Sequence, residues 1–156
     1  MSVLLVAVDQ LIKWLVITHL KPISTYPIIK GILHLEYVEN RGVAFGMFQN
    51  NKFISIGITG IMLLIIMYLI FSNKIYSLFF GNKKNPIVQW ALAILLAGGI
   101  GNYIDRLFRG YVVDYVYFVP INFPSFNFAD ICVTVSCALL LLYIIFIQPK
   151  EDIKAD

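Results

Sequence analysis

Two aspartates stand at the two ends of a short aromatic-rich stretch that leads into a very apolar C-terminal segment. Asp114 follows Val112-Val113, and Asp130 ends the run Phe126-Asn127-Phe128-Ala129-Asp130 sixteen residues later. A low dielectric penalises the charged form of a carboxylate, so aspartates at the edge of hydrocarbon point to a function. Two carboxylates that face each other can share one proton, with one acting as base and the other as acid. The pair therefore predicts acid–base chemistry, such as the activation of water.

Asp130 also has a purely structural interpretation. It lies at the start of the last apolar segment, where a carboxylate interacts favourably with the helix dipole. Asn127, three residues earlier, is suited either to cap that helix or to orient the carboxylate. The catalytic interpretation gains because a second aspartate, in an equally apolar setting, is within reach of the same membrane face.

A second charged pair lies near the N-terminus. Asp9 and Lys13 are four residues apart in an apolar run, so they share one helix face and would neutralise each other in lipid. The main interpretation is a structural pair that is packed inward. Direct contact with a substrate is the alternative.

Glycines and polar residues meet at the end of a third apolar run, Gly98-Gly99-Ile100-Gly101-Asn102-Tyr103-Ile104-Asp105-Arg106. Three glycines in four positions allow another backbone or a ligand to approach closely. Asn102 and Asp105 fall on adjacent parts of one helix face, with Arg106 beside them. Tight helix packing with an interfacial ion pair and a functional site are about equally well supported by these residues.

Composition indicates what must position these groups. The chain has 156 residues, 60% of them hydrophobic and 13% charged, so residues 1–156 are expected to form a single membrane domain. A hydrocarbon core of about 30 Å takes roughly 20 helical residues. Four runs fit, approximately 2–20, 53–71, 86–104 and 128–148. The expected fold class is therefore an all-α membrane protein with four transmembrane helices, since helices satisfy their own backbone hydrogen bonds in lipid.

Two polar segments between the spans carry β-like patterns. Residues 32–39 alternate in part between apolar and polar and break at Asn40-Arg41-Gly42, which predicts a small extracytoplasmic β-structure between the first two helices. Residues 110–124, rich in Tyr, Phe and Val, suggest a second piece at the headgroup interface. The loop 72–85 holds Lys74, Lys83 and Lys84 without an acid. We therefore expect this loop and both termini to be cytoplasmic.

Several functions are disfavoured by the residues present. The net charge of +3 suits basic membrane edges and does not suggest nucleic acid. With two histidines and no HExxH motif, a zinc peptidase is unsupported, and no P-loop or dinucleotide fingerprint is present. No metal or organic cofactor is expected. Two alternatives stay open: a transporter that uses its aspartates as a proton or ion relay, and a non-catalytic scaffold protein.

Five blocks along the chain resemble the signature blocks of one family, signal peptidase II, the bacterial lipoprotein signal peptidases. In order, they are Asp9-Gln10-Leu11-Ile12-Lys13, Asn40-Arg41-Gly42-Val43-Ala44-Phe45-Gly46, Gly101-Asn102-Tyr103-Ile104-Asp105-Arg106, Val112-Val113-Asp114 and Phe126-Asn127-Phe128-Ala129-Asp130. Each block alone is a weak signal, but five in order on a four-span chain are specific.

The resemblance implies a multi-pass aspartic peptidase of the bacterial inner membrane, with its active site near the extracytoplasmic face. Its partners would be prolipoproteins, cleaved before a diacylglyceryl-modified lipobox cysteine, together with membrane lipid and the inhibitor globomycin. It implies that Asp114 and Asp130 form the catalytic dyad and that Asp9 and Lys13 support the site. Further positions implied around substrate and dyad are Asn40, Gly42, Asn102, Arg106, Asn127 and Ala129.

One departure concerns the first helix. Only eight residues precede Asp9, whereas the family's first helix usually begins further upstream. The expected first span is therefore short, with Asp9 near its middle. A start site placed too late, or a locally thinned bilayer, would account for this.

Overall fold

The computed structural model describes residues 1–42, 52–81 and 84–148. Four helices in it are long and apolar enough to cross a membrane: Ser2–Leu20, Phe53–Phe71, Pro86–Phe108 and Phe128–Ile147. The expected four-helix architecture is confirmed. The third helix runs four residues beyond the expected end at Ile104, and Asp105 and Arg106 in the added turn are buried inside the protein.

The helix α4, Pro86–Phe108, is the centre of the bundle. It packs against α1 (Ser2–Leu15), α2 (Lys52–Phe71) and α5 (Phe128–Leu142). Asn85 caps its start, and Pro86 occupies the first turn, where a proline loses no helical hydrogen bond. The helices α1 and α5 each continue into a π-helical turn, Val16–Leu20 and Tyr143–Ile147. The apolar side chains of α2 face mostly outward, as lipid contact permits.

The segment 72–85, expected to be a loop, contains a short helix, α3 (Asn73–Phe80). Ser72 accepts a hydrogen bond from the backbone N–H of Ile75 and so caps this helix. Tyr76 and Phe80 lie four residues apart on one face and pack into an apolar cluster with Val88, Leu92 and Tyr143. This buried face makes the segment helical, although its basic residues suggested only a loop.

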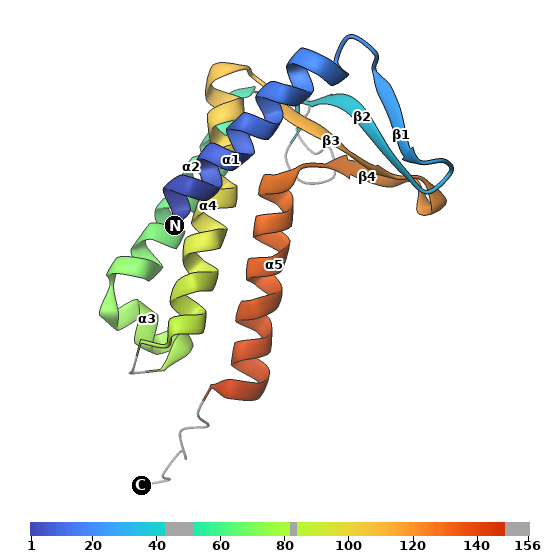
Figure 1. Cartoon of the computed structure of the whole chain (residues 1–156). Coiled ribbons are helices and arrows are strands. Elements are labelled where there is room, and N and C mark those ends of the chain that lie inside the picture. The colour runs from blue at the N-terminus through green and yellow to red at the C-terminus, as the bar shows by residue number, and fades with distance from the viewer. Residues whose placement is uncertain (43–51, 82–83, 149–156) are drawn as a thin grey trace, which may run out of the picture.

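Within the described residues, the strands form one antiparallel sheet of four, in the order β1-β2-β3-β4. Two strands come from the segment between α1 and α2, β1 (Thr25–Ile29) and β2 (Leu33–Asn40), which confirms the predicted β-structure there. The other two, β3 (Val112–Phe118) and β4 (Phe123–Phe126), come from the segment between α4 and α5. Figure 1 shows this sheet projecting to one side at one end of the helices.

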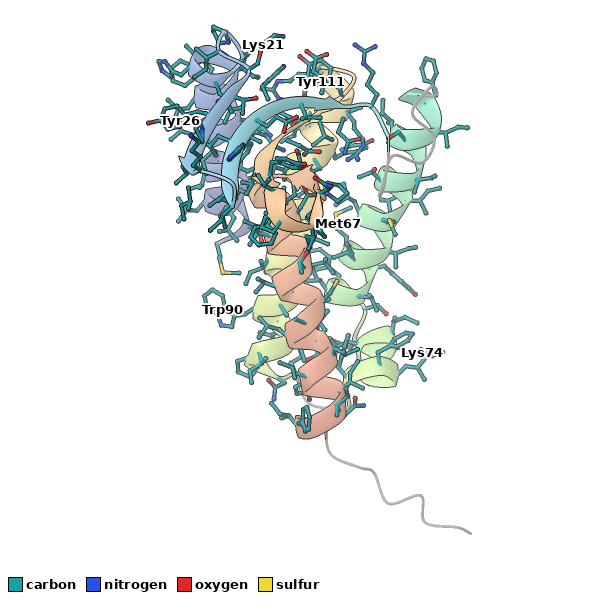
Figure 2. The ribbon with its side chains drawn as sticks, turned by 90° about the vertical axis from the view of Figure 1, so that its right-hand side faces the viewer. Lys21, Tyr26, Met67, Lys74, Trp90 and Tyr111 are labelled. Atoms are coloured by element: carbon teal, nitrogen blue, oxygen red, sulfur yellow. The ribbon has the colours of Figure 1, made fainter. Side chains whose placement is uncertain are left out.

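The β2–β3 pairing brings distant parts of the chain together. Val38 lies opposite Asp114, and Asn40 lies opposite Val112. A second apolar cluster, formed by Val16, Leu20, Val113 and Tyr115, fixes the sheet to the end of the first span. In Figure 2, Lys21 and Tyr111 lie at this sheet end of the molecule, and Lys74 lies at the opposite end.

Candidate active site

Asp114 and Asp130 are brought to one polar cluster where the sheet meets the helices. Asp114 lies on β3 and is 2% exposed, and Asp130 lies in the first turn of α5. Asn127 stands between them. Its side-chain Nδ2 donates to Oδ1 of Asp114 at 2.7 Å, and its backbone N–H donates to Oδ2 of Asp130 at 3.0 Å. One residue therefore contacts both carboxylates.

The position of Asn127 is set by its role as a helix cap. Its side-chain oxygen accepts from the backbone N–H of Asp130, and Asp130 bonds back to the Asn127 N–H, so the two form a capping box. With its oxygen held in this way, the carboxamide must turn its NH₂ group toward Asp114. The hydroxyl of Tyr115 accepts from the Phe128 N–H, which satisfies another free donor of the helix start. The sequence suited Asn127 either to cap this helix or to orient the carboxylate, and the structure shows both contacts.

Two further carboxamides complete the hydrogen bonding of the aspartates. The Nδ2 of Asn102 donates to Oδ1 of Asp130 at 2.8 Å, and the Nδ2 of Asn40 donates to Oδ2 of Asp114 at 2.9 Å. The oxygen of Asn40 accepts from the Gly42 N–H at 3.0 Å, which fixes the orientation of its amide. All four carboxylate oxygens therefore accept N–H donors from outside the pair.

Burial raises the pKa of Asp114 to about 7, and the negative charge of Asp130 adds to the increase. The hydrogen bonds from Asn40 and Asn127 act in the opposite direction, because they favour the charged carboxylate. A carboxyl group with this pKa holds a proton for a large part of the time at neutral pH. A proton donor thus lies beside a second carboxylate, as general acid–base chemistry requires.

Arg106 is a cation that lies within electrostatic reach of both Asp114 and Asp130. Its guanidinium donates to the hydroxyl of Ser55 at 3.0 Å and to the carbonyl oxygens of Gly42 and Asn102 at 3.1 and 3.3 Å. All three acceptors are neutral, so the positive charge stays available to the neighbouring aspartates. Gly42 itself is buried and forms the link between Arg106 and Asn40.

Lys13 occupies the centre of a buried charge network behind the aspartates. It is fully buried, and its Nζ lies 2.9 Å from Asp9 and 3.0 Å from Asp105. It also donates to the side-chain oxygen of Asn102 at 2.9 Å. The expected neutralisation of Asp9 by Lys13 is confirmed. Since a lysine can only donate, this contact also forces the NH₂ group of Asn102 toward Asp130.

Asp105 belongs to this charge network and not to the pair of aspartates. Its carboxylate pairs with Lys13 and with Arg109, and it accepts from the backbone N–H of Val113 at 3.1 Å. The side chain of Gln10 reaches the same carboxylate at 3.3 Å. These contacts therefore fix the first residues of β3, the strand that carries Asp114. Its charges balance, with Asp9 and Asp105 against Lys13 and Arg109.

The glycines of α4 permit the close packing on which these contacts depend. A Cβ atom on Gly98 would lie 2.5 Å from the carbonyl oxygen of Ala129, and one on Gly101 would lie 2.5 Å from Oδ2 of Asp9. The Ala129 N–H donates to the other oxygen of Asp9 at 3.1 Å. The methyl group of Ala129 lies within 3.3 Å of the Gly101 Cβ position, which leaves no room for a larger side chain.

The site contains groups that the sequence-based analysis did not single out as functional: Ser55, Gln10, Arg109 and Tyr115. Ser55, Gln10 and Arg109 are polar residues in or beside apolar helices. A single polar contact there leaves no periodic pattern in the sequence. Among the described residues, no group of three or more His, Cys, Asp or Glu side chains is placed to hold a metal ion. What the arrangement offers chemically is a buried carboxyl group and a half-buried one, with a proton to share and a cation beside them.

Comparisons with known proteins agree over nearly the whole chain. The family model described as signal peptidase (SPase) II matches residues 1–146. The lipoprotein signal peptidase of Symbiobacterium thermophilum is 36% identical over 152 residues, covering 96% of this chain and 95% of that protein. The one from Caldanaerobacter subterraneus subsp. tengcongensis is 39% identical over 151 residues, covering 94% and 97%. A solved bacterial membrane enzyme superposes with a TM-score of 0.79 at 26% identity, covering 99% of this chain and 91% of that one.

Proposed function

Because this chain belongs to the signal peptidase II family, we propose that it is a multi-pass membrane endopeptidase acting on diacylglyceryl-modified prolipoproteins. It cuts the bond before the lipobox cysteine and releases the signal peptide. Asp114 and Asp130 form its catalytic dyad. The observation that carries this assignment is the position of Asn127, which bonds to both carboxylates within one polar cluster.

The dyad works by sharing one proton. Asp130, as a carboxylate, takes a proton from water, whose oxygen then attacks the scissile carbonyl carbon. Asp114 holds the shared proton, since its pKa is raised to about 7, and donates it to the carbonyl oxygen as the tetrahedral intermediate forms. When the C–N bond breaks, the proton on Asp130 passes to the leaving amine of the cysteine. As the carbonyl re-forms, one hydroxyl group of the intermediate returns a proton to Asp114, so the dyad again holds one proton and the new carboxyl terminus stays on the signal peptide.

The surrounding residues position these groups. Asn102 and the backbone of Asn127 hold Asp130, whereas Asn40 and the side chain of Asn127 hold Asp114. Arg106 places a positive charge beside the dyad, where negative charge develops in the transition state. Asp9 and Lys13 support Asn102 and the start of α5 from behind. Gly42 and Ala129 contribute backbone contacts and close packing.

The two ends of the molecule support an orientation in the membrane. The sheet, whose strand β3 carries Asp114, lies at one end, and the basic residue Lys74 lies at the other (Figure 2). By the positive-inside rule, the Lys74 end faces the cytoplasm. The active site then lies near the extracytoplasmic face of the bacterial inner membrane, and both termini are cytoplasmic. A lipidated substrate reaches it laterally through the bilayer, and globomycin-type cyclic peptides compete for the same site.

Cleavage of a defined substrate tests this function. The purified full chain in detergent is incubated with a lipobox peptide, either diacylglyceryl-modified or unmodified at the cysteine. We expect the wild type to cut only the modified peptide, directly before the cysteine, and Asp114→Asn and Asp130→Asn each to be inactive. Glu36→Gln, which changes an acid on β2 outside the site, serves as the matched control and keeps full activity. An inactive wild type, or aspartate variants that cut normally, would overturn the proposed function.

A further inference from the structure

We infer that Ser55 is a positioning residue for the cleavage reaction, because its hydroxyl holds the Arg106 guanidinium in place beside the dyad. The inference rests on the proposed function and adds a residue to it. Ser55 lies in the first turns of α2, a helix whose other side chains are mostly exposed and apolar. Its own side chain is 2% exposed, so this one polar group of α2 is turned into the protein.

The contact between Ser55 and Arg106 fixes one edge of the guanidinium. The Nε of Arg106 lies 3.0 Å from the Ser55 hydroxyl oxygen, and Arg106 is 9% exposed. Nε belongs to the rigid plane of the guanidinium, so a partner at that atom restricts rotation of the whole group. The Ser55 oxygen accepts this hydrogen bond from a residue 51 positions away in the sequence.

A continuous path leads from this contact to the dyad. Arg106 donates from Nη2 to the carbonyl of Gly42 at 3.1 Å. The Gly42 N–H holds the side-chain oxygen of Asn40 at 3.0 Å, and Asn40 donates to Asp114 at 2.9 Å. Ser55 thus influences Asp114 both through this chain of hydrogen bonds and through the location of the Arg106 charge.

The electrostatic effect has a definite sign. Arg106 lies within electrostatic reach of Asp130, Asp114 and Asp105, and a nearby cation favours the charged form of a carboxylate. If the guanidinium moves away, the ionised form of the dyad is less favoured. Loss of the Ser55 hydroxyl should then shift the acid limb of the pH–rate profile toward higher pH. A side chain that only fills space would not produce such a shift.

Three variants of the full chain in detergent separate these possibilities. Ser55→Ala removes the hydroxyl, Ser55→Thr keeps it, and Thr59→Val removes a hydroxyl one turn later that donates to the Ser55 carbonyl of its own helix. On the lipidated lipobox peptide, we expect Ser55→Ala to lower kcat about tenfold with little change in KM, since one hydrogen bond to a charged group is lost. Its acid limb should rise by about 0.5 pH unit. Ser55→Thr and Thr59→Val should behave like the wild type.

A second measurement does not depend on activity. With ¹⁵N-labelled arginine, exchange of the Arg106 Nε–H with solvent is expected to be slow in the wild type and Ser55→Thr, and faster in Ser55→Ala. The inference is overturned if Ser55→Ala keeps the wild-type kcat and pH profile, if Ser55→Thr fails to restore them, or if Nε–H exchange is unchanged. An inactive wild type would overturn the proposed function alone, and the exchange rates would still decide whether Ser55 holds Arg106.

Discussion

Asn127 joins the start of a helix to a candidate catalytic group, because its oxygen caps α5 while its Nδ2 donates to Asp114 at 2.7 Å. The two roles use opposite ends of one carboxamide. The cap therefore fixes which atom faces Asp114, and helix formation and orientation of the dyad are coupled in a single side chain.

Replacement of Asn127 can separate these roles. Serine is an equally good N-cap but lacks an NH₂ group, so Asn127→Ser should keep α5 capped while Asp114 loses a donor. We expect kcat/KM to fall at least about tenfold. Asn127→Ala, which also loses the cap, should be less stable than Asn127→Ser by roughly 1 kcal/mol. Peptide cleavage and thermal unfolding of both variants test this, and full activity of Asn127→Ser would contradict it.

The pH dependence of cleavage should reveal the shared proton. Burial, and then the charge of Asp130, raise the pKa of Asp114 to about 7. Above that pH Asp114 is ionised and the proton donor is lost. We therefore expect kcat/KM to decline as the pH rises through about 7. A rate profile from pH 5 to 9 in one detergent checks this, and a flat profile across that range would exclude Asp114 as the proton donor.

The same carboxyl group should make stability depend on pH. The folded protein keeps the Asp114 proton up to pH about 7, whereas the unfolded chain releases it near pH 4. Because the folded state binds the extra proton in this interval, its stability falls as the pH rises from about 4 to 7. The Tm of the wild type should therefore drop more steeply over this range than that of Asp114→Asn. Parallel slopes would contradict the prediction.

Loss of the buried lysine should be far more damaging than loss of an exposed one. Lys13→Met leaves Asp9 and Asp105 facing each other without the cation between them, which should cost about 3–5 kcal/mol of stability. Lys21→Met is the matched control, since Lys21 is 47% exposed in its pair with Glu39 and should cost less than about 1 kcal/mol. Thermal unfolding of both in detergent gives the comparison, and equal effects would contradict it.

A methyl group added at Gly101 tests the close packing of the site. In Gly101→Ala, the new Cβ would lie 2.5 Å from Oδ2 of Asp9, so the contact of Asp9 with Lys13 must shift. We expect both Tm and activity to fall. Gly57→Ala on α2 meets nothing within 4 Å and should be neutral or stabilising by roughly 0.5–1 kcal/mol, as alanine favours a helix. If Gly101→Ala keeps the wild-type Tm and activity, then α1 and α4 can move apart without loss of stability or activity.

The sequence predicted the four helices because hydrophobic length is a local property. It also suited Asn127 either to cap α5 or to orient a carboxylate, and the cap was within reach of the sequence because it depends on residues three positions apart. The dyad itself was selected by two aspartates in apolar surroundings and by the resemblance of five short blocks, and its catalytic role stays a prediction. The segment containing α3 was wrongly expected to be a loop, because its basic residues hid the apolar face made by Tyr76 and Phe80.

What the sequence did not reveal depends on contacts between distant residues. Ser55 is one hydroxyl in an apolar helix, and only the position of Arg106 on another helix gives it a role. Asp105 stands next to Arg106 in the sequence but pairs with Lys13 and Arg109, because the turn of α4 points these side chains in different directions. Such pairings are set by helix packing, which local patterns do not encode.

The hydrogen bond from the Ala129 N–H to Asp9 spans 120 positions of the chain, and it bears on how the protein is made. Asp9 emerges from the ribosome and enters the membrane long before its partner in α5 exists. Asp114 is likewise synthesised before Asn127, its hydrogen-bond partner, and before Asp130. Because Asp130 lies on α5, the proposed pair of Asp114 and Asp130 can form only after this helix has been made.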